Sequence, residues 1–131
     1  MANSRKSPFF ADMTPDDIRS FCLSLSHAVE DTPFGPEALV YKVAGKMFAL
    51  LLPEDVPPRL NLKCEPDYAL ELRDRHAAIR PGYHMNKRHW NTLTLDGSLP
   101  VRLVRDLIRH SYDRVIAGLP ARQREGMRDE G

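Results

Sequence analysis

A stretch of twelve residues, GYHMNKRHWNTL at positions 82–93, brings together side chains suited to an acidic ligand. It holds two imidazoles, two cations, two amides and three large side chains that can stack or pack, but no carboxylate. Lys87 and Arg88 are groups that bind phosphate oxygens, and Tyr83 and Trp90 offer faces on which nucleobases stack. The stretch therefore predicts a surface for nucleic acid or for another anionic ligand.

These side chains also have explanations that need no ligand. A single tryptophan in a domain of this size usually packs in the core, so Trp90 serves either packing or stacking. Lys87 and Arg88 sit at an expected hairpin tip, where charge alone favours solubility. Both alternatives stay open, although acids are scarce nearby: Asp74 is the only one between Leu72 and Asp96.

A second basic row follows from the alternation in Arg59-Leu60-Asn61-Leu62-Lys63-Cys64. Successive side chains of a strand point to opposite faces, so the leucines and the cysteine face the core while Arg59, Asn61 and Lys63 face water. Lys42 and Lys46, at a neighbouring hairpin, would extend the row. If these strands adjoin the 82–93 stretch, the sheet carries one positive surface.

The sequence lacks the short motifs of common catalytic and metal sites. There is no glycine-rich phosphate loop, no nucleophile elbow and no Cys-x-x-Cys pair. His84 and His89 would need a third ligand such as Cys64 to bind zinc, and two histidines of a hairpin more often hydrogen-bond across it. Ser111 follows His110 directly, and adjacent helical side chains point in different directions. We therefore expect no catalysis, no metal and no cofactor.

Length and composition are those of one globular domain. The chain has 131 residues, 42% hydrophobic and 28% charged, and no apolar run approaches the roughly 18 residues of a membrane span. The net charge of +1 means that any nucleic-acid affinity must come from one concentrated patch. Cys22 and Cys64 fall at apolar positions of their elements, as buried reduced thiols do. We expect a cytoplasmic protein without a secretory signal.

Capping residues and periodicity predict the order helix, three strands, helix, two strands, helix. Thr14-Pro15-Asp16-Asp17 starts the first helix, whose apolar stripe runs to about Glu30. The clearest strands are expected at 38–43, 46–52, 59–64 and 89–95, with a second helix at 65–75. Ala44-Gly45 makes the first two strands a hairpin. Asn86 tolerates left-handed backbone, so the chain should reverse near 85–87.

The last helix begins at Pro100 and presents an apolar stripe to the core. Its opposite face carries Arg102, Arg105, Asp106, Arg109 and Asp113. These charges lie at spacings that allow ion pairs, which predicts a solvated surface. The helix ends at 118–120, so the domain spans 14–120. An N-terminal extension at 1–13 precedes it, and a charged tail at 121–131, expected to fray, follows it.

These motifs resemble the MmcQ/YjbR, or YjbR-like, family of small bacterial domains. The matching segments are PFGPEALVYKVAGKMFAL at 33–50, LNLKCEPDYALELR at 60–73, PGYHMNKRHWNTLTLDG at 81–97 and LIRHSYDRVIAGLP at 107–120. The resemblance runs from about Ile18 to Pro120, and GYHMNKRHWNT is its most specific part. The first dozen residues and Ala121-Arg122 depart from the family pattern.

The resemblance implies an α+β domain of CyaY-like fold, an antiparallel sheet packed by helices in the order α-β-β-β-α-β-β-α. Members of the family are described as DNA-binding proteins with a double-wing motif, a description that rests on architecture, and fold alone does not determine function. Carried over by position, the nucleic-acid-binding candidates are Asn61, Lys63, Asn86, Lys87, Arg88, His89 and Trp90.

The favoured hypothesis is a non-catalytic domain that binds DNA through phosphate contacts of a basic hairpin wing. A protein-binding or chaperone-like adaptor would instead use an apolar or mixed patch and would be largely indifferent to salt. A small-ligand pocket lined by Tyr83, His84 and Trp90 is the third alternative.

Overall fold

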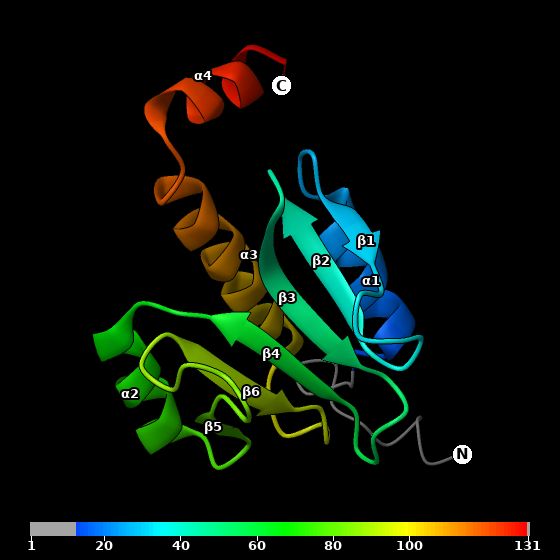
Figure 1. Cartoon of the computed structure of the whole chain (residues 1–131). Helices are drawn as coiled ribbons and strands as arrows, with labels where there is room; N and C mark the ends of the chain where they lie inside the picture. Colours follow the sequence, from blue (N-terminus) through cyan, green and yellow to red (C-terminus); the bar gives the residue numbers. More distant parts are fainter. Residues whose placement is uncertain (1–12, 131) are drawn as a thin grey trace.

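The computed structural model describes residues 13–130 and shows a six-stranded antiparallel sheet with four helices (Figure 1). The helices are α1 (Pro15–Ser24), α2 (Pro66–Arg75), α3 (Val101–Ala117) and α4 (Ala121–Glu130). The strands are β1 (Val29–Asp31), β2 (Leu39–Val43), β3 (Lys46–Leu52), β4 (Arg59–Lys63), β5 (Ile79–Pro81) and β6 (Trp90–Thr94). They lie in the order β1-β2-β3-β4-β6-β5. The predicted α+β class and element order are confirmed, with β1 and α4 as additional elements.

Two local motifs form as the sequence predicts. At the start of α1, Thr14 N–H donates to Asp17 Oδ2 over 3.0 Å and Asp17 N–H donates to Thr14 Oγ1 over 3.1 Å, a reciprocal capping box. Between β2 and β3, Ala44 and Gly45 have φ angles of +50° and +76°. Two consecutive left-handed residues twist the chain in the sense that a tight antiparallel hairpin requires.

The end of the first helix was predicted wrongly. The expected stripe runs to about Glu30, but α1 ends at Ser24, and Val29–Asp31 pairs with β2 as strand β1. His27 has a φ of +64°, which breaks right-handed helical backbone. Val29 is 55% exposed, so it does not belong to the buried stripe despite its helical spacing from Leu25.

The core lies between the sheet and the helices α1 and α3, which are behind the sheet in Figure 1. Fully buried side chains include Ile18, Cys22, Tyr41, Phe48, Leu60, Leu62, Leu93 and Ile108. Because side chains alternate along a regular strand, the neighbours of Leu60, Leu62 and Leu93 in β4 and β6 point to the other side, which is called the outer face below. No helix within residues 13–130 is long and apolar enough to cross a membrane.

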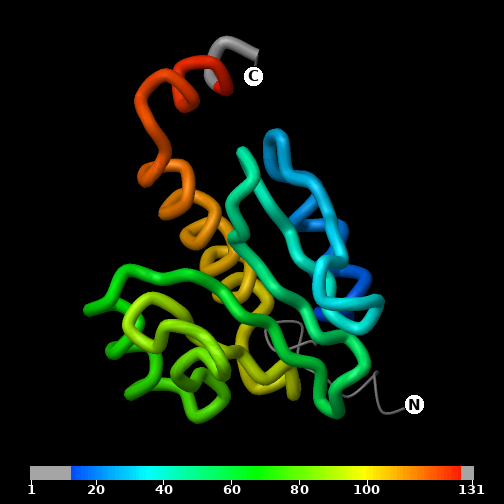
Figure 2. The backbone as a smooth tube through the Cα atoms, in the orientation of Figure 1, coloured from blue at the N-terminus to red at the C-terminus, as the bar shows by residue number. Residues whose placement is uncertain are grey.

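The charged tail, expected to fray, forms helix α4, and the chain bends between α3 and α4 at the top of Figure 2. Gln123 N–H and Arg124 N–H donate to Pro120 O over 3.0 and 3.2 Å. The Arg124 guanidinium donates to Ala117 O and Leu119 O over 3.1 and 2.9 Å. The first two bonds begin α4, and the bond to Ala117 O satisfies a carbonyl group that the end of α3 leaves without a helical partner.

Ser111 attaches α3 to the middle of the sheet. Its hydroxyl donates to Phe48 O over 2.5 Å and accepts from Lys63 N–H over 2.8 Å, with the residue fully buried. The register between β2 and β3 shifts at this point, which places Phe48 in a β-bulge. A bulge disrupts the strand ladder, so a side-chain partner for Phe48 O stabilises it.

We predict that Ser111→Ala lowers the free energy of unfolding by about 1–3 kcal/mol, because it leaves buried backbone groups without partners. Urea denaturation followed by circular dichroism measures the change. Ser20→Ala, at an exposed position of α1, is the matched control and should have little effect. Equal effects of the two substitutions would contradict the role of the Ser111 hydroxyl.

The imidazole of His110 must be neutral to hold the start of α2. Its Nε2 accepts from Glu65 N–H over 3.1 Å, which requires an unprotonated nitrogen. Burial, followed by the nearby Arg114 charge, lowers the pKa of His110 below its ordinary value. The unfolded chain therefore binds the proton more readily than the folded chain does.

We predict that the free energy of unfolding falls as the pH drops from about 7.5 to about 5.5, through the unfolded pKa of His110 and toward its lower folded pKa. His110→Gln keeps an acceptor that does not titrate, so it should reduce this pH dependence. Urea denaturation of both proteins across the range measures the difference. Identical pH dependence in the two proteins would exclude His110 as the source.

Candidate nucleic-acid interface

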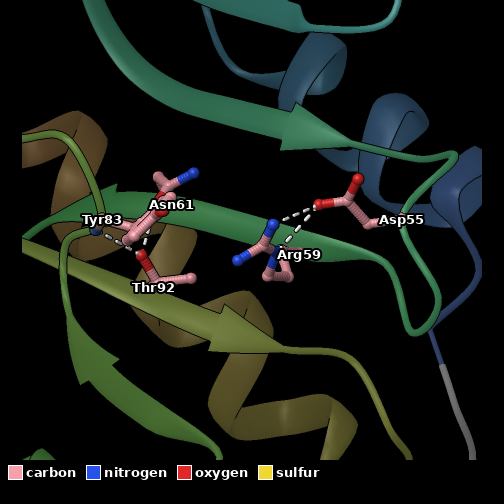
Figure 3. Close-up of polar contacts among 5 residues, drawn as sticks. All are labelled: Asp55, Arg59, Asn61, Tyr83 and Thr92. Carbon is pink, nitrogen blue, oxygen red and sulfur yellow. Dashed lines mark hydrogen bonds and ion pairs between the residues drawn. The ribbon is translucent and has the colours of Figure 1, made fainter.

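The loop at residues 82–89, called the wing below, folds back against the outer face of the sheet. Thr92 of β6 is the Cα partner of Asn61 in β4. Tyr83 N–H donates to Thr92 Oγ1 over 3.1 Å, and the Thr92 hydroxyl donates to Asn61 Oδ1 over 2.5 Å (Figure 3). This chain of hydrogen bonds joins the wing to the centre of the sheet.

The structure differs from the sequence-based prediction at one site residue, Asn61. Alternation places Asn61 on the outer face as expected, but the residue is only 3% exposed, so its expected exposure to water is wrong. Its amide is engaged by Thr92, and Tyr83 lies beside it in Figure 3. A short polar side chain in the middle of a sheet becomes buried once another segment folds over it. Asn61 therefore lies beneath the wing and helps to hold it on the sheet through Thr92.

Arg59 lies on the same face, between an acid and an aromatic ring. Its Nε and Nη2 both lie 2.8 Å from Asp55 Oδ2, and its guanidinium carbon lies 5.7 Å from the centre of the Tyr83 ring (Figure 3). Tyr83 is 60% exposed, and its ring centre lies 4.0 Å from that of His84. The wing therefore begins with two exposed adjacent rings next to a cation, an arrangement suited to base stacking.

Hydrogen bonds around Asn86 shape the middle of the wing. Asn86 Oδ1 accepts from Arg88 N–H over 2.9 Å, and Asn86 O accepts from His89 N–H and Trp90 N–H over 3.2 and 3.0 Å. The reversal that the sequence predicts near residues 85–87 is therefore built on this asparagine. Its backbone is not left-handed, however; the left-handed residue is His84, with a φ of +59°.

Arg73 of α2 holds the wing from the side of the helix. Its Nε donates to Asn91 Oδ1 over 2.6 Å, and its Nη2 donates to Trp90 O over 3.3 Å and to Lys87 O. One planar guanidinium thus fixes both the wing and the first residues of β6. Nothing in the local sequence around Arg73 indicates this role, because its partners lie 14 to 18 positions further along the chain.

Gly82 allows the wing to approach β6 closely. Its N–H donates to Trp90 O over 2.8 Å, and a Cβ added at Gly82 would lie 2.8 Å from Trp90 Cβ. Trp90 is half-buried and lies opposite Lys63 in the register of β4 and β6. The tryptophan is therefore part of the junction between wing and sheet, and some of its surface stays accessible.

The other residues predicted to bind nucleic acid differ in how exposed their side chains are. Asn86, Lys87 and Arg88 are exposed, while Lys63 and His89 are half-buried. His89 O accepts from Cys64 N–H over 2.7 Å, and His89 Nδ1 is buried without a hydrogen-bond partner among the described residues. His89 therefore lies at the base of the wing, and the exposed tip is formed by the asparagine and the two cations.

Fewer cations are free of acidic partners than the sequence suggests. Arg59 forms an ion pair with Asp55, and Lys42 forms one with Asp31 over 3.0 Å. Lys63, Lys87 and Arg88, in contrast, have no ion pair with any residue that the structure describes. Their charges remain available to an anionic ligand.

The described residues contain no group of three or more His, Cys, Asp and Glu that could hold a metal ion. Cys64, the third zinc ligand that the sequence offers to His84 and His89, is 3% exposed. Burial, followed by the charge of Glu65, raises the pKa of its thiol to about 11, so the thiolate that zinc prefers is disfavoured.

The family is decided by comparison with known sequences. A family model described as YjbR matches residues 23–114 of the chain. The chain belongs to the YjbR family. It is 40% identical over 96 residues to the uncharacterised protein YbdF of Escherichia coli O157:H7, covering 73% of this chain and 79% of that one. It is 33% identical over 113 residues to YjbR of Escherichia coli strain K12, covering 86% and 96%.

Solved structures agree with this assignment. A Deinococcus radiodurans protein with a DUF419 domain is similar with a TM-score of 0.84 and 41% identity, over 93% of this chain and 91% of that one. A Pseudomonas syringae protein gives a TM-score of 0.69 and 27% identity, over 78% and 98%. The family resemblance seen in the sequence is thus confirmed, and the wing lies inside the segment that the YjbR model matches.

We predict that Arg73→Lys loosens the wing without unfolding the domain, because an ammonium cannot replace the guanidinium fork. Amide hydrogen exchange at Gly82 and Trp90 should accelerate by about tenfold, the equivalent of one net hydrogen bond. Arg75→Lys is the matched control, since among the described residues Arg75 forms its ion pair with the exposed Glu71 of the same helix, away from the wing. Unchanged exchange in the Arg73 variant would show that the wing does not depend on it.

Proposed function

We propose that this YjbR-family chain is a non-catalytic domain that binds DNA through the wing. The observation that supports the proposal is the pair of exposed cations, Lys87 and Arg88, on a loop whose backbone is tied to the sheet and to α2. Their charges are not neutralised within the described chain. Such cations bind backbone phosphates, and a loop held in place loses little freedom on binding.

Lys63 and the exposed ring of Tyr83 extend the proposed contact. Lys63 lies opposite Trp90 on the outer face, next to the wing. Tyr83 and His84 provide adjacent rings that stack on an unpaired base more readily than on a base pair within a duplex. The proposal therefore includes single-stranded as well as duplex DNA. Three phosphate contacts imply a modest affinity and a slope of log affinity against log salt of roughly −2.7 for duplex DNA.

The absence of catalysis is part of the proposal, and it is supported by the hydrogen bonds that two chemically active side chains already make. Ser111 and His110 are committed to backbone hydrogen bonds inside the domain. The proposal also places the protein in the cytoplasm, where Cys22 and Cys64 would persist as the free thiols that the structure contains.

We predict that Lys87→Ala combined with Arg88→Ala lowers DNA affinity by about tenfold and reduces the salt slope by about 2 for duplex DNA. Fluorescence anisotropy of labelled single-stranded and duplex DNA at two salt concentrations measures both quantities. Circular dichroism confirms that the variant folds.

The matched control combines Arg102→Ala with Arg105→Ala, which removes the same charge from exposed positions of α3. This variant should bind DNA as the unaltered chain does. Equal losses in the two variants would indicate attraction by total charge alone, and no binding of either DNA at low salt would refute the proposed function.

A further inference from the structure

A groove lies between α1 and α3, on the opposite side of the sheet from the wing. Its volume is about 730 Å³, and Phe21, Pro100 and Val101 form its apolar part. All three are half-buried, so they stay accessible to a ligand. A groove of this size with an apolar floor is large enough to take several side chains of a partner.

Three arginines, Arg102, Arg105 and Arg109, line the same groove together with Asp106. Their spacing would allow ion pairs with Asp106 and Asp113, but no such pair occurs in the described part of the chain. Arg105 and Arg109 instead lie 5.8 and 5.6 Å from the centre of the Phe21 ring. Arg105 and Arg109 therefore lie beside an aromatic ring and have no ion pair with any acid that the structure describes.

The lining residues specify the chemistry of the ligand. Three arginines against one aspartate favour an anionic partner, and the guanidinium fork matches carboxylates. Arg102 and Arg109 are seven residues apart, which is about 10 Å along the helix axis, so the ligand needs acidic groups at separated positions. The apolar floor favours a ligand with an apolar side chain between those acids.

Nucleic acid fits this groove less well than a peptide does. Phe21 is half-buried, so it offers a base less of a stacking face than the exposed Tyr83 does, and Asp106 repels a uniformly negative strand. A peptide can place an apolar residue on the ring and a neutral residue opposite the aspartate. Arginine and aromatic residues are also enriched where proteins bind one another.

We propose that the groove between α1 and α3 binds an acidic segment of a partner protein. Carboxylates of the segment pair with Arg102, Arg105 and Arg109, and an apolar side chain packs against Phe21. This site is independent of the wing, because it lies on the other side of the sheet and uses none of the same residues. A failure of the DNA proposal would leave it unaffected.

The test is a selection from a displayed library of random peptides of roughly twelve residues against the full chain. Enriched peptides should carry two or more acidic residues flanking an apolar one. Their affinity, measured by anisotropy of the labelled peptides, should fall by about tenfold or more when Arg105→Glu and Arg109→Glu are combined. The matched control, Lys87→Glu with Arg88→Glu on the wing, should bind them unchanged.

Other outcomes would overturn the proposal. These are the absence of enrichment, enriched peptides without acidic residues, or equal affinity for the groove variant and the unaltered chain. Displacement of the peptide by single-stranded DNA would instead assign the groove to nucleic acid. If the groove variant fails to fold, an enriched peptide is titrated into the unaltered chain and the amide chemical shifts are followed. Shift changes confined to α1 and α3 support the site, and shift changes on the wing refute it.

Discussion

The buried hydroxyl of Ser111 sets the position of α3, and the two candidate surfaces follow from that position. Its bonds to Phe48 O and Lys63 N–H hold the helix across β3 and β4. The apolar stripe of α3 is thereby directed into the core, and the arginine face is directed away from the sheet. The outer face stays free of α1 and α3, which lie behind the sheet, and the wing folds back against it.

The wing depends on polar contacts from both sides. Arg73 binds it from α2, and the chain from Asn61 through Thr92 to Tyr83 binds it to the sheet. These contacts use backbone groups of the wing and do not use the side chains of Lys87 and Arg88. The two cations can project from the loop because other residues determine its shape.

Much of the fold could be predicted because local signals were strong. The capping box at Thr14, the Ala44-Gly45 turn and the stripe of α3 each act within a few residues, and each formed as expected. The errors arose where distant contacts decide. Val29 has helical spacing from Leu25, yet pairing with Lys42 in β2 makes it part of a strand. Asn61 has the alternation of an exposed residue, yet the wing buries it.

The sequence by itself determined the family, the α+β order and the concentration of cations and rings at 82–93, because these depend on residue types and short spacings. Only the tertiary structure decided which charges remain free. Lys42 pairs with Asp31 of the neighbouring strand and Arg59 with Asp55 four positions earlier, whereas Lys87 and Arg88 have no ion pair with any residue that the structure describes. The tertiary structure also places Arg105 and Arg109 of α3 beside the ring of Phe21 in α1. The physical reason is that a charge interacts with its neighbours in space, and most of those neighbours are set by packing between elements rather than by position in the chain.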